Sequence, residues 1–360
     1  MIEYKNKCSD ESFSDLFDRL VCGRTVERDE WRQLLVLEDN DKLEFLRNQA
    51  EQLMNERFGK GVFIRGLIEI SSYCRNDCYY CGLRCSNLHA QRYRLTEDEI
   101  MACCRSGYQA GFSTFVLQGG EDPRQDDVWL AGVVRSIKAE FSDCAVTLSV
   151  GERSAEAYRL FKSVGVDRYL LRHETANERH YADLHPARMS LANRMSCLEI
   201  LKKLEIQTGT GMMIGSPGQT VDCLLDDIAF METLQPEMIG MGPFIPAAHT
   251  PFAACQSGSV EMTLRLISLM RLRFPDALIP ATTALATLDQ YGRERAIRSG
   301  ANVIMPNLSP RELRKCYSIY DHKACTGGES AEALNLIEQQ LACIGYHIEY
   351  GRGDYQKRGI

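Results

Sequence analysis

The chain has 360 residues, of which 44% are hydrophobic and 25% charged, and its formal net charge at pH 7 is −7. This composition is typical of a folded globular protein, and the lack of a basic excess argues against a nucleic-acid-binding face. No apolar run approaches the roughly 18 residues of a membrane span. The polar residues 1–10 lack the apolar segment of an export signal, so we expect a cytoplasmic protein with no membrane partner.

The N-terminal part of the chain predicts helices over residues 11–21 and 28–58, ahead of alternating strands and helices. Thr96 with Glu99 forms a capping pattern, and Ser154 marks another helix start. The short apolar segments between the helical stretches are the strand candidates. They cover residues 62–71, 114–120, 145–151, 168–174, 208–215, 238–245, 278–285 and 301–307.

Eight strands that alternate with helices predict a parallel sheet, and eight such units are the number that closes a (β/α)₈ barrel. We therefore predict an α/β fold, a TIM-type barrel over residues 61–325. A helical extension (1–60) precedes it, and a closing helix and tail (326–360) follow. An open, doubly wound sheet is the alternative. In a barrel the active site lies at the carboxyl ends of the strands.

The chain contains 15 cysteines, a high number for a protein without an export signal. The cytosol keeps thiols reduced, so the scattered cysteines are predicted to be small buried apolar residues. Cys74, Cys78 and Cys81 differ, because they follow the first strand with the spacing C-x3-C-x2-C. Soft thiolates at such spacing bind zinc or an iron–sulfur cluster. Cys85 or His89 could complete a zinc site, so both metals stay open at this point.

This loop resembles the cluster loop of the radical S-adenosylmethionine (SAM) superfamily. The resemblance implies a [4Fe-4S] cluster held by the three cysteines, with one open iron that binds SAM. Reductive cleavage of SAM would then give a 5′-deoxyadenosyl radical. Tyr80, the aromatic residue before the third cysteine, would contact the adenine.

The second strand ends in Gln118, Gly119, Gly120 and Glu121. Adjacent glycines let a ligand approach the backbone closely, although a Gly-Gly pair also makes an ordinary turn. The resemblance implies that the Gly-Gly-Glu motif holds the methionine amino group of SAM. We predict all four residues as cofactor contacts.

Alternation places Thr147 and Ser149 on one face of the third strand, with hydroxyls suited to a ribose or a carboxylate. Bonds from these hydroxyls to nearby backbone are an equal alternative. We predict Ser149 as a cofactor contact and Thr147 as a substrate contact.

Arg172 and Glu174 share a face at the end of the fourth strand, where a zwitterionic ligand could neutralise both. They could instead pair only with each other. Glu174 suits a ribose or amino contact and Arg172 a carboxylate. Arg194, further along, could reach the methionine carboxylate. Met213, in the fifth strand, resembles an apolar cover for the adenine, and core packing explains it nearly as well.

Four segments together point to one branch of the superfamily. They are residues 117–123, 172–177, 242–246 and 279–285. They resemble the radical enzymes of [FeFe]-hydrogenase maturation of the HydE type, relatives of biotin synthase and methylornithine synthase. The resemblance implies a small cysteine-bound iron carbonyl cyanide complex as substrate. The implied partners are other hydrogenase maturases and reduced ferredoxin or flavodoxin. The implied lining of the substrate cavity is Arg172, Thr282, Thr283, Met305, Tyr317 and Tyr320.

One departure from the resemblance concerns a second cluster site that some members carry near the C-terminus. Cys325 could be its first ligand, but Ala333 and Leu336 occupy the other two positions, so we predict that this site is absent. Two other functions stay open. One is a related radical enzyme, such as an amino-acid mutase of the methylornithine synthase type, and the other is a non-catalytic iron–sulfur scaffold.

Overall fold

Six parallel strands form the largest sheet of the computed structural model, which describes residues 10–323 and 333–357. Their spatial order is β2-β3-β4-β5-β6-β8, so the strands follow one another around the sheet in chain order. Neighbours in the sheet are joined by helices, as parallel pairing requires. The strands are β2 (Gly66–Ser71), β3 (Thr114–Gly119), β4 (Ala145–Ser149), β5 (Arg168–Leu170), β6 (Gln207–Thr210) and β8 (Met238–Ile239).

Shorter pairings close this sheet into a barrel. A bridge joins Met238 to Leu278, and the next joins Pro280 to Val303 in β10 (Val303–Ile304). Asn307 then bridges back to Leu67 in β2. The predicted barrel is therefore confirmed, and the open sheet is excluded. β1 (Gly61–Ile64), the first half of the predicted first strand, pairs with β10 and with β11 (His347–Glu349).

Two of the predicted strands are broken into shorter pieces. The fifth consists of β6 and β7 (Met213–Ile214), and the sixth consists of β8 and β9 (Gly242–Pro243), which pairs with β7. The first break falls at Gly211, whose φ is 155° and where a Cβ would lie only 1.8 Å from the carbonyl oxygen of Gly240. Only glycine allows the two backbones to approach this closely.

The second half of the seventh predicted strand is wrong. Residues 283–285 belong instead to helix α11 (Thr283–Leu288), because Thr282 takes the extended conformation of an N-cap residue, with φ −75° and ψ 149°. Residues 278–280 keep their strand role through the two bridges described above. Thr282 and Thr283 therefore lie at the start of a helix, at the carboxyl end of the barrel.

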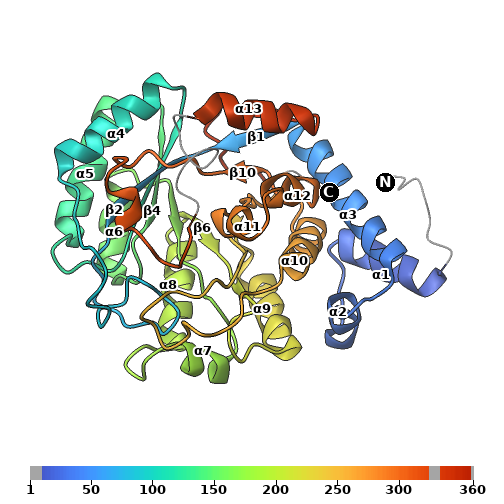
Figure 1. Cartoon of the computed structure of the whole chain (residues 1–360). Coiled ribbons are helices and arrows are strands. Elements are labelled where there is room, and N and C mark those ends of the chain that lie inside the picture. Colours follow the sequence, from blue (N-terminus) through green and yellow to red (C-terminus); the bar gives the residue numbers. More distant parts are fainter. Residues whose placement is uncertain (1–9, 324–332, 358–360) are drawn as a thin grey trace.

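Helices surround the barrel (Figure 1). Their starts confirm two of the capping predictions, since Thr96 and Glu99 form a capping box and the Ser154 side chain accepts from the backbone of Ala157. The helices that follow strands are α4 (Glu97–Gln109), α5 (Asp127–Glu140), α6 (Ala155–Ser163), α7 (Glu178–Leu184), α8 (Leu191–Lys203), α9 (Val221–Leu234), α10 (Val260–Arg273) and α12 (Gly292–Arg298).

The N-terminal helices are α1 (Glu11–Val21), α2 (Arg28–Leu35) and α3 (Asn40–Phe58). The helix predicted over residues 28–58 is thus two helices, because Asp39 caps α3 by accepting from the backbone N–H groups of Asp41 and Lys42. In Figure 1 these helices lie to one side of the barrel, where α3 contacts α10 and α12, and α2 contacts α9. After η1 (Arg314–Cys316), the chain ends with α13 (Leu334–Cys343) and β11. The proposed division at residues 60 and 325 stays a prediction, and Cys325 lies outside the described residues.

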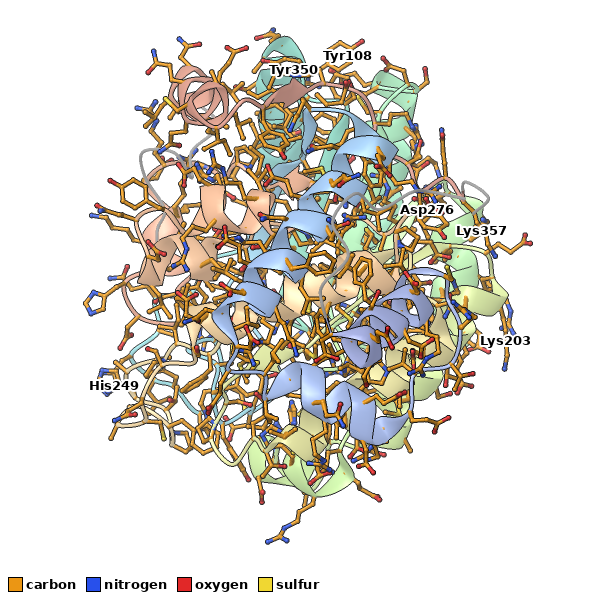
Figure 2. The ribbon with its side chains drawn as sticks, turned by 90° about the vertical axis from the view of Figure 1, so that its right-hand side faces the viewer. Tyr108, Lys203, His249, Asp276, Tyr350 and Lys357 are labelled. Carbon is orange, nitrogen blue, oxygen red and sulfur yellow. The ribbon has the colours of Figure 1, made fainter. Side chains whose placement is uncertain are left out.

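The two ends of the barrel are distinguished in Figure 2 by the labelled residues. Lys203 and Asp276 come just before strand segments and lie on one side of the view, whereas His249 follows β9 and lies on the other. The first side is closed by the C-terminal tail, where Asp354 pairs with the fully buried Arg168 at 2.5 Å. The carboxyl ends of the strands, where a barrel has its active site, therefore lie on the side of His249. None of the described helices is long and apolar enough to cross a membrane.

Candidate active site

A cavity of about 340 Å³ lies at the carboxyl ends of the strands. It brings together most of the predicted site residues, from segments as far apart as the cysteine loop and the segment after η1. The predicted residues that line it are Cys78, Tyr80, Cys81, Gln118, Gly119, Ser149, Arg172, Glu174, Arg194, Met213, Thr282, Thr283, Met305, Tyr317 and Tyr320. Four predicted residues do not line it, namely Cys74, Gly120, Glu121 and Thr147.

Cys74 packs behind the cavity against the glycine pair at the end of β3. A Cβ at Gly120 would lie 2.7 Å from the Cβ of Cys74 and 2.4 Å from the carbonyl oxygen of Tyr73. Any side chain at position 120 would push the cysteine loop away from the barrel. One role of Gly120 is therefore to let the loop approach the strand ends.

The three thiols of the loop are weak acids in their surroundings. Burial raises the pKa of Cys74, of Cys78 and of Cys81, the last to about 12, and the nearby thiols add to the rise. Neutral thiols are therefore expected in the absence of a cation, and a bound metal centre supplies the positive charge that stabilises thiolates. Three soft donors of this kind fit a thiolate-bound cluster.

The competing zinc ligands have other contacts in the structure. Cys85 is exposed, with an arginine nitrogen of Arg188 3.6 Å from its sulfur. The ring of His89 stacks on that of His249, with centroids 3.9 Å apart. Among residues 10–323 and 333–357, no three His, Cys, Asp or Glu side chains are grouped as a metal site. The cysteines' role as ligands thus stays a prediction.

Tyr80 forms one wall of the cavity together with Met213. The two pack in an apolar cluster with Leu184 and Phe244, which suits a flat apolar ring such as adenine. The hydroxyl of Tyr80 lies 3.2 Å from Nε2 of His185, whose Nδ1 lies 3.0 Å from the carbonyl oxygen of Tyr181. Because a carbonyl only accepts, Nδ1 carries the proton, and Nε2 accepts from Tyr80.

His185 was not predicted from the sequence, and it acts on the cavity through Tyr80. Burial lowers its pKa to about 3, so the ring is neutral and can accept the hydrogen bond from Tyr80. Tyr181 also stacks on His185, with ring centroids 4.0 Å apart. The orientation of Tyr80 therefore depends on a histidine more than a hundred residues away.

Glu121 turns toward a second hollow beside the cysteine loop. Its carboxylate accepts from Nε of Arg75 at 2.9 Å and from the backbone N–H of Glu152 at 2.8 Å. This hollow has a volume of about 410 Å³, and its walls include Arg75, Glu121, Glu152 and Asn193. Glu121 is thus a charged group held at the edge of the cavity, in contact with the cluster loop through Arg75.

Arg194 and Arg172 reach the cavity as members of ion pairs. Nε of Arg194 lies 2.6 Å from Glu152, and its Nη1 donates to the carbonyl oxygen of Arg172 at 3.1 Å. Arg172 pairs with Glu174 at 2.8 Å. Arg172 and Glu174 therefore contact each other, and their roles as ligand contacts stay predictions. Glu152 is a further residue that sequence reasoning missed.

The prediction that Arg172 and Glu174 share one face of a strand is wrong. β5 ends at Leu170, and Glu174 has a φ of 65°, so strand alternation does not place the two side chains on one face. The chain turns after Arg172, and the turn brings the carboxylate back to the guanidinium. Glu174 then forms a bridge to Met212.

Several buried polar atoms around the cavity have no hydrogen-bond partner within the described part of the chain. They are Nε of Arg172 and the hydroxyls of Thr147 and Thr282. Buried polar atoms are nearly always paired, so unpaired ones at a cavity indicate a polar ligand or water. Thr147 is 2% exposed and lies deeper along the strand than Ser149, which does line the cavity.

The cavity lining also contains a charged pair that was not predicted. Glu69, from β2, is fully buried and pairs with Lys323, while its other oxygen accepts from Asn307 at 3.0 Å. The Lys323 ammonium lies 4.8 Å from the centre of the Tyr317 ring. The hydroxyl of Tyr317 in turn accepts from Nε2 of Gln118 at 3.4 Å. Both members of the pair line the cavity.

Fold and site together are those of a radical SAM enzyme, and residues 68–231 match the radical SAM superfamily. The chain is 41% identical over 322 residues to the [FeFe] hydrogenase maturase subunit HydE of Thermotoga maritima, a match that covers 89% of this chain and 92% of that one. The chain therefore belongs to the HydE family of the radical SAM superfamily. Its cofactors are accordingly a [4Fe-4S] cluster and S-adenosylmethionine.

Two other relatives confirm the breadth of this likeness. The 3-methylornithine synthase of Methanosarcina barkeri is 29% identical and is covered to 88%, with 86% of this chain aligned. The crystal structure of methylornithine synthase (PylB) superposes with a TM-score of 0.82 at 26% identity, over 93% of this chain and 97% of that one. The predicted relatives are thus confirmed as relatives.

Proposed function

We propose that this enzyme acts on a small cysteine-bound iron carbonyl cyanide complex during assembly of the diiron subcluster of [FeFe] hydrogenase. The observation that supports this most is the 41% identity to HydE along 89% of the chain. Cys74, Cys78 and Cys81 would hold the cluster, which supplies the electron that cleaves SAM to the 5′-deoxyadenosyl radical. Other maturases would provide the substrate, and reduced ferredoxin or flavodoxin the electron.

The chain's own residues divide the cavity into two parts. Tyr80 and Met213 give an apolar wall for the adenine, and Glu174 and Arg194 provide charges for the ribose and the methionine carboxylate. Ser149, Gln118, Gly119, Gly120 and Glu121 complete the proposed cofactor contacts.

The remaining cavity residues provide the proposed substrate contacts. Arg172 and the hydroxyls of Thr282 and Thr283 suit the anionic ligands of an iron complex or a carboxylate. Tyr317 is buried and Tyr320 is half-buried, and each adds an apolar ring beside a hydroxyl. Their surroundings raise the pKa of both by desolvation, so each stays protonated. Met305 and Thr147 complete this part of the proposal.

The first experiment is anaerobic reconstitution with iron and sulfide, followed by incubation with SAM and a reductant. We expect a brown protein with four irons per cluster that forms 5′-deoxyadenosine. A colourless protein with one stoichiometric zinc would contradict the proposal. A protein that loads a cluster but forms no 5′-deoxyadenosine would be a scaffold.

The cofactor contacts are tested by Glu174→Gln and Arg194→Met, which should abolish 5′-deoxyadenosine formation while iron content stays that of the parent. Glu178→Gln is the matched control, because Glu178 is an exposed glutamate at the start of α7. Cofactor cleavage that survived both site substitutions would refute the assignment.

A second candidate function is an amino-acid mutase, which the likeness to the 3-methylornithine synthases favours. The two functions share the radical step and differ only in the substrate part of the cavity. Product analysis separates them, since a mutase rearranges a carbon skeleton and a maturase changes an iron complex. Formation of 3-methylornithine would establish the second candidate, and neighbouring hydrogenase maturation genes would favour the first.

A further inference from the structure

Glu174 is held in a backbone conformation that side chains rarely adopt. Its φ is 65°, in the left-handed region that favours glycine. Its N–H donates to the carbonyl oxygen of Gly211 at 3.1 Å, and its own carbonyl accepts from the N–H of Met213 at 3.2 Å. A strained residue persists only where its surroundings fix it, and such residues cluster at ligand sites.

One buried carboxylate contacts the chain on both sides of Glu174. Asp227, on α9, accepts through Oδ1 from the backbone N–H of Ala176. The same oxygen lies 3.3 Å from Nε2 of His173. Asp227 and His173 are both fully buried. His173 and Ala176, on either side of Glu174, therefore both contact the same carboxylate oxygen on α9.

His173 is tied on its other side as well. Its Nδ1 lies 2.9 Å from the hydroxyl of Thr210 at the end of β6, and Thr210 also donates to the carbonyl oxygen of Leu171. The imidazole thus spans from the neighbouring strand to α9. Phe230, on α9, packs edge-on against the ring.

Burial of the Asp227 carboxylate lowers the stability of the fold relative to an apolar residue. The other buried residues of α9 are a cysteine, a methionine and apolar aliphatic side chains. A buried carboxylate costs free energy unless it is paired and hydrogen-bonded, and an apolar residue in its place would pack α9 as well. A buried charge at this point needs a reason beyond packing.

We propose that Asp227 and His173 are positioning residues that hold Glu174 in its left-handed conformation and so present its carboxylate to the cofactor. This inference rests on the proposed contact between Glu174 and SAM. Neither Asp227 nor His173 lines the cavity, so they act through the backbone of residues 173–176.

The test compares Asp227→Ala, Asp227→Asn and Asp222→Ala in the reconstituted holoenzyme. Asp227→Ala should raise the KM for SAM about tenfold with a smaller change in kcat, since it weakens ground-state binding. Asp227→Asn keeps an oxygen that accepts from Ala176 and should restore the KM to within about threefold of the parent. Asp222, on the same helix, pairs outward with Arg28 and Arg32, so its replacement should leave the KM unchanged.

Iron content and the spectrum of the reduced cluster without SAM should match the parent in all three variants. If Asp227→Ala loads no cluster, Thr210→Val takes its place, because it removes only the hydroxyl that contacts His173, and it should raise the KM about threefold. An unchanged KM in the variant that is measured, or an equal rise in Asp222→Ala, would overturn the inference. A parent enzyme that forms no 5′-deoxyadenosine would refute the proposed function instead.

Discussion

The two parts of the cavity are built in different ways. The part proposed for the cofactor is made mainly from strand ends and the loops after them: Tyr80 lies in the loop after β2, Glu174 follows β5, and Met213 lies in β7. The substrate part draws on the chain after β10, where Tyr317, Tyr320 and Lys323 lie in a segment with little regular structure. The barrel strands thus position the proposed cofactor part, whereas an irregular segment packed on the barrel completes the proposed substrate part.

The attachment is made by a few identifiable contacts. The N–H of Gly82, just after the cysteine loop, donates to the carbonyl oxygen of Ile319 at 2.9 Å. The backbone of Asp321 donates to Pro246, and its carboxylate accepts from Ala248. Lys323 then pairs with Glu69 inside the cavity. Variation in this segment can change the substrate without disturbing the radical chemistry, as expected for functional loops on a rigid scaffold.

The largest expected effect lies in the cofactor part. Cys78→Ala should abolish 5′-deoxyadenosine formation and iron–sulfur absorbance, since a cluster needs each of its thiolates. Cys85→Ala is the matched control, because Cys85 lies in the same loop and is exposed. It should keep both properties. Loss of the cluster in Cys85→Ala, with retention in Cys78→Ala, would show that Cys85 and not Cys78 is the cluster ligand. Iron assay and absorbance spectra measure the result.

Breaking the buried pair should loosen the substrate part alone. Lys323→Met leaves Glu69 buried without its cation, which should lower the free energy of unfolding by about 3 kcal/mol. The double variant Lys323→Met, Glu69→Gln removes both charges and should recover most of the loss. Urea denaturation measures the stability. The KM for SAM should stay that of the parent, and a large rise would show that the two parts are not separable.

The difference between the two parts also explains what could be predicted from the sequence. The alternation of strands and helices is a local pattern, so the barrel could be predicted from it. The cysteine spacing and the Gly-Gly-Glu motif are local too, so the proposed cofactor contacts could be predicted through the resemblance that these motifs carry. The Glu69–Lys323 pair joins residues 254 positions apart, and no local pattern reveals such a contact. The bend at Glu174 was missed for a related reason, since its causes, Gly211 and Asp227, lie on other elements.

Gly82 offers a test of the contact between the two parts. A Cβ at this position would lie 2.1 Å from the carbonyl oxygen of Ser318, so Gly82→Ala should force the loop and the segment apart at a cost of about 1–3 kcal/mol. Gly132→Ala is the control, because Gly132 lies in α5 with no atom within 4 Å of an added Cβ. That change should stabilise the protein by about 0.5–1 kcal/mol. Thermal unfolding measures both. A neutral Gly82→Ala would show that the contact is loose.

Acid should weaken the cofactor part through His185. The folded protein lowers the pKa of this histidine to about 3, below its ordinary value of about 6.5. Between these values the unfolded chain takes up a proton that the folded chain does not. Stability should therefore fall by about 1 kcal/mol for each unit of pH below 6.5. His185→Gln keeps an acceptor for Tyr80 and a donor for Tyr181 but cannot take up the proton.

We therefore expect His185→Gln to flatten the dependence of unfolding free energy on pH between about 5 and 6.5 by that amount. His347→Gln, in an exposed position of β11, should leave the slope as in the parent. The KM for SAM should stay constant over this pH range, because folded His185 remains neutral and still accepts from Tyr80. A slope in His185→Gln as steep as in the parent would mean that burial does not lower the pKa of His185 in the folded protein, and that other groups cause the loss of stability in acid.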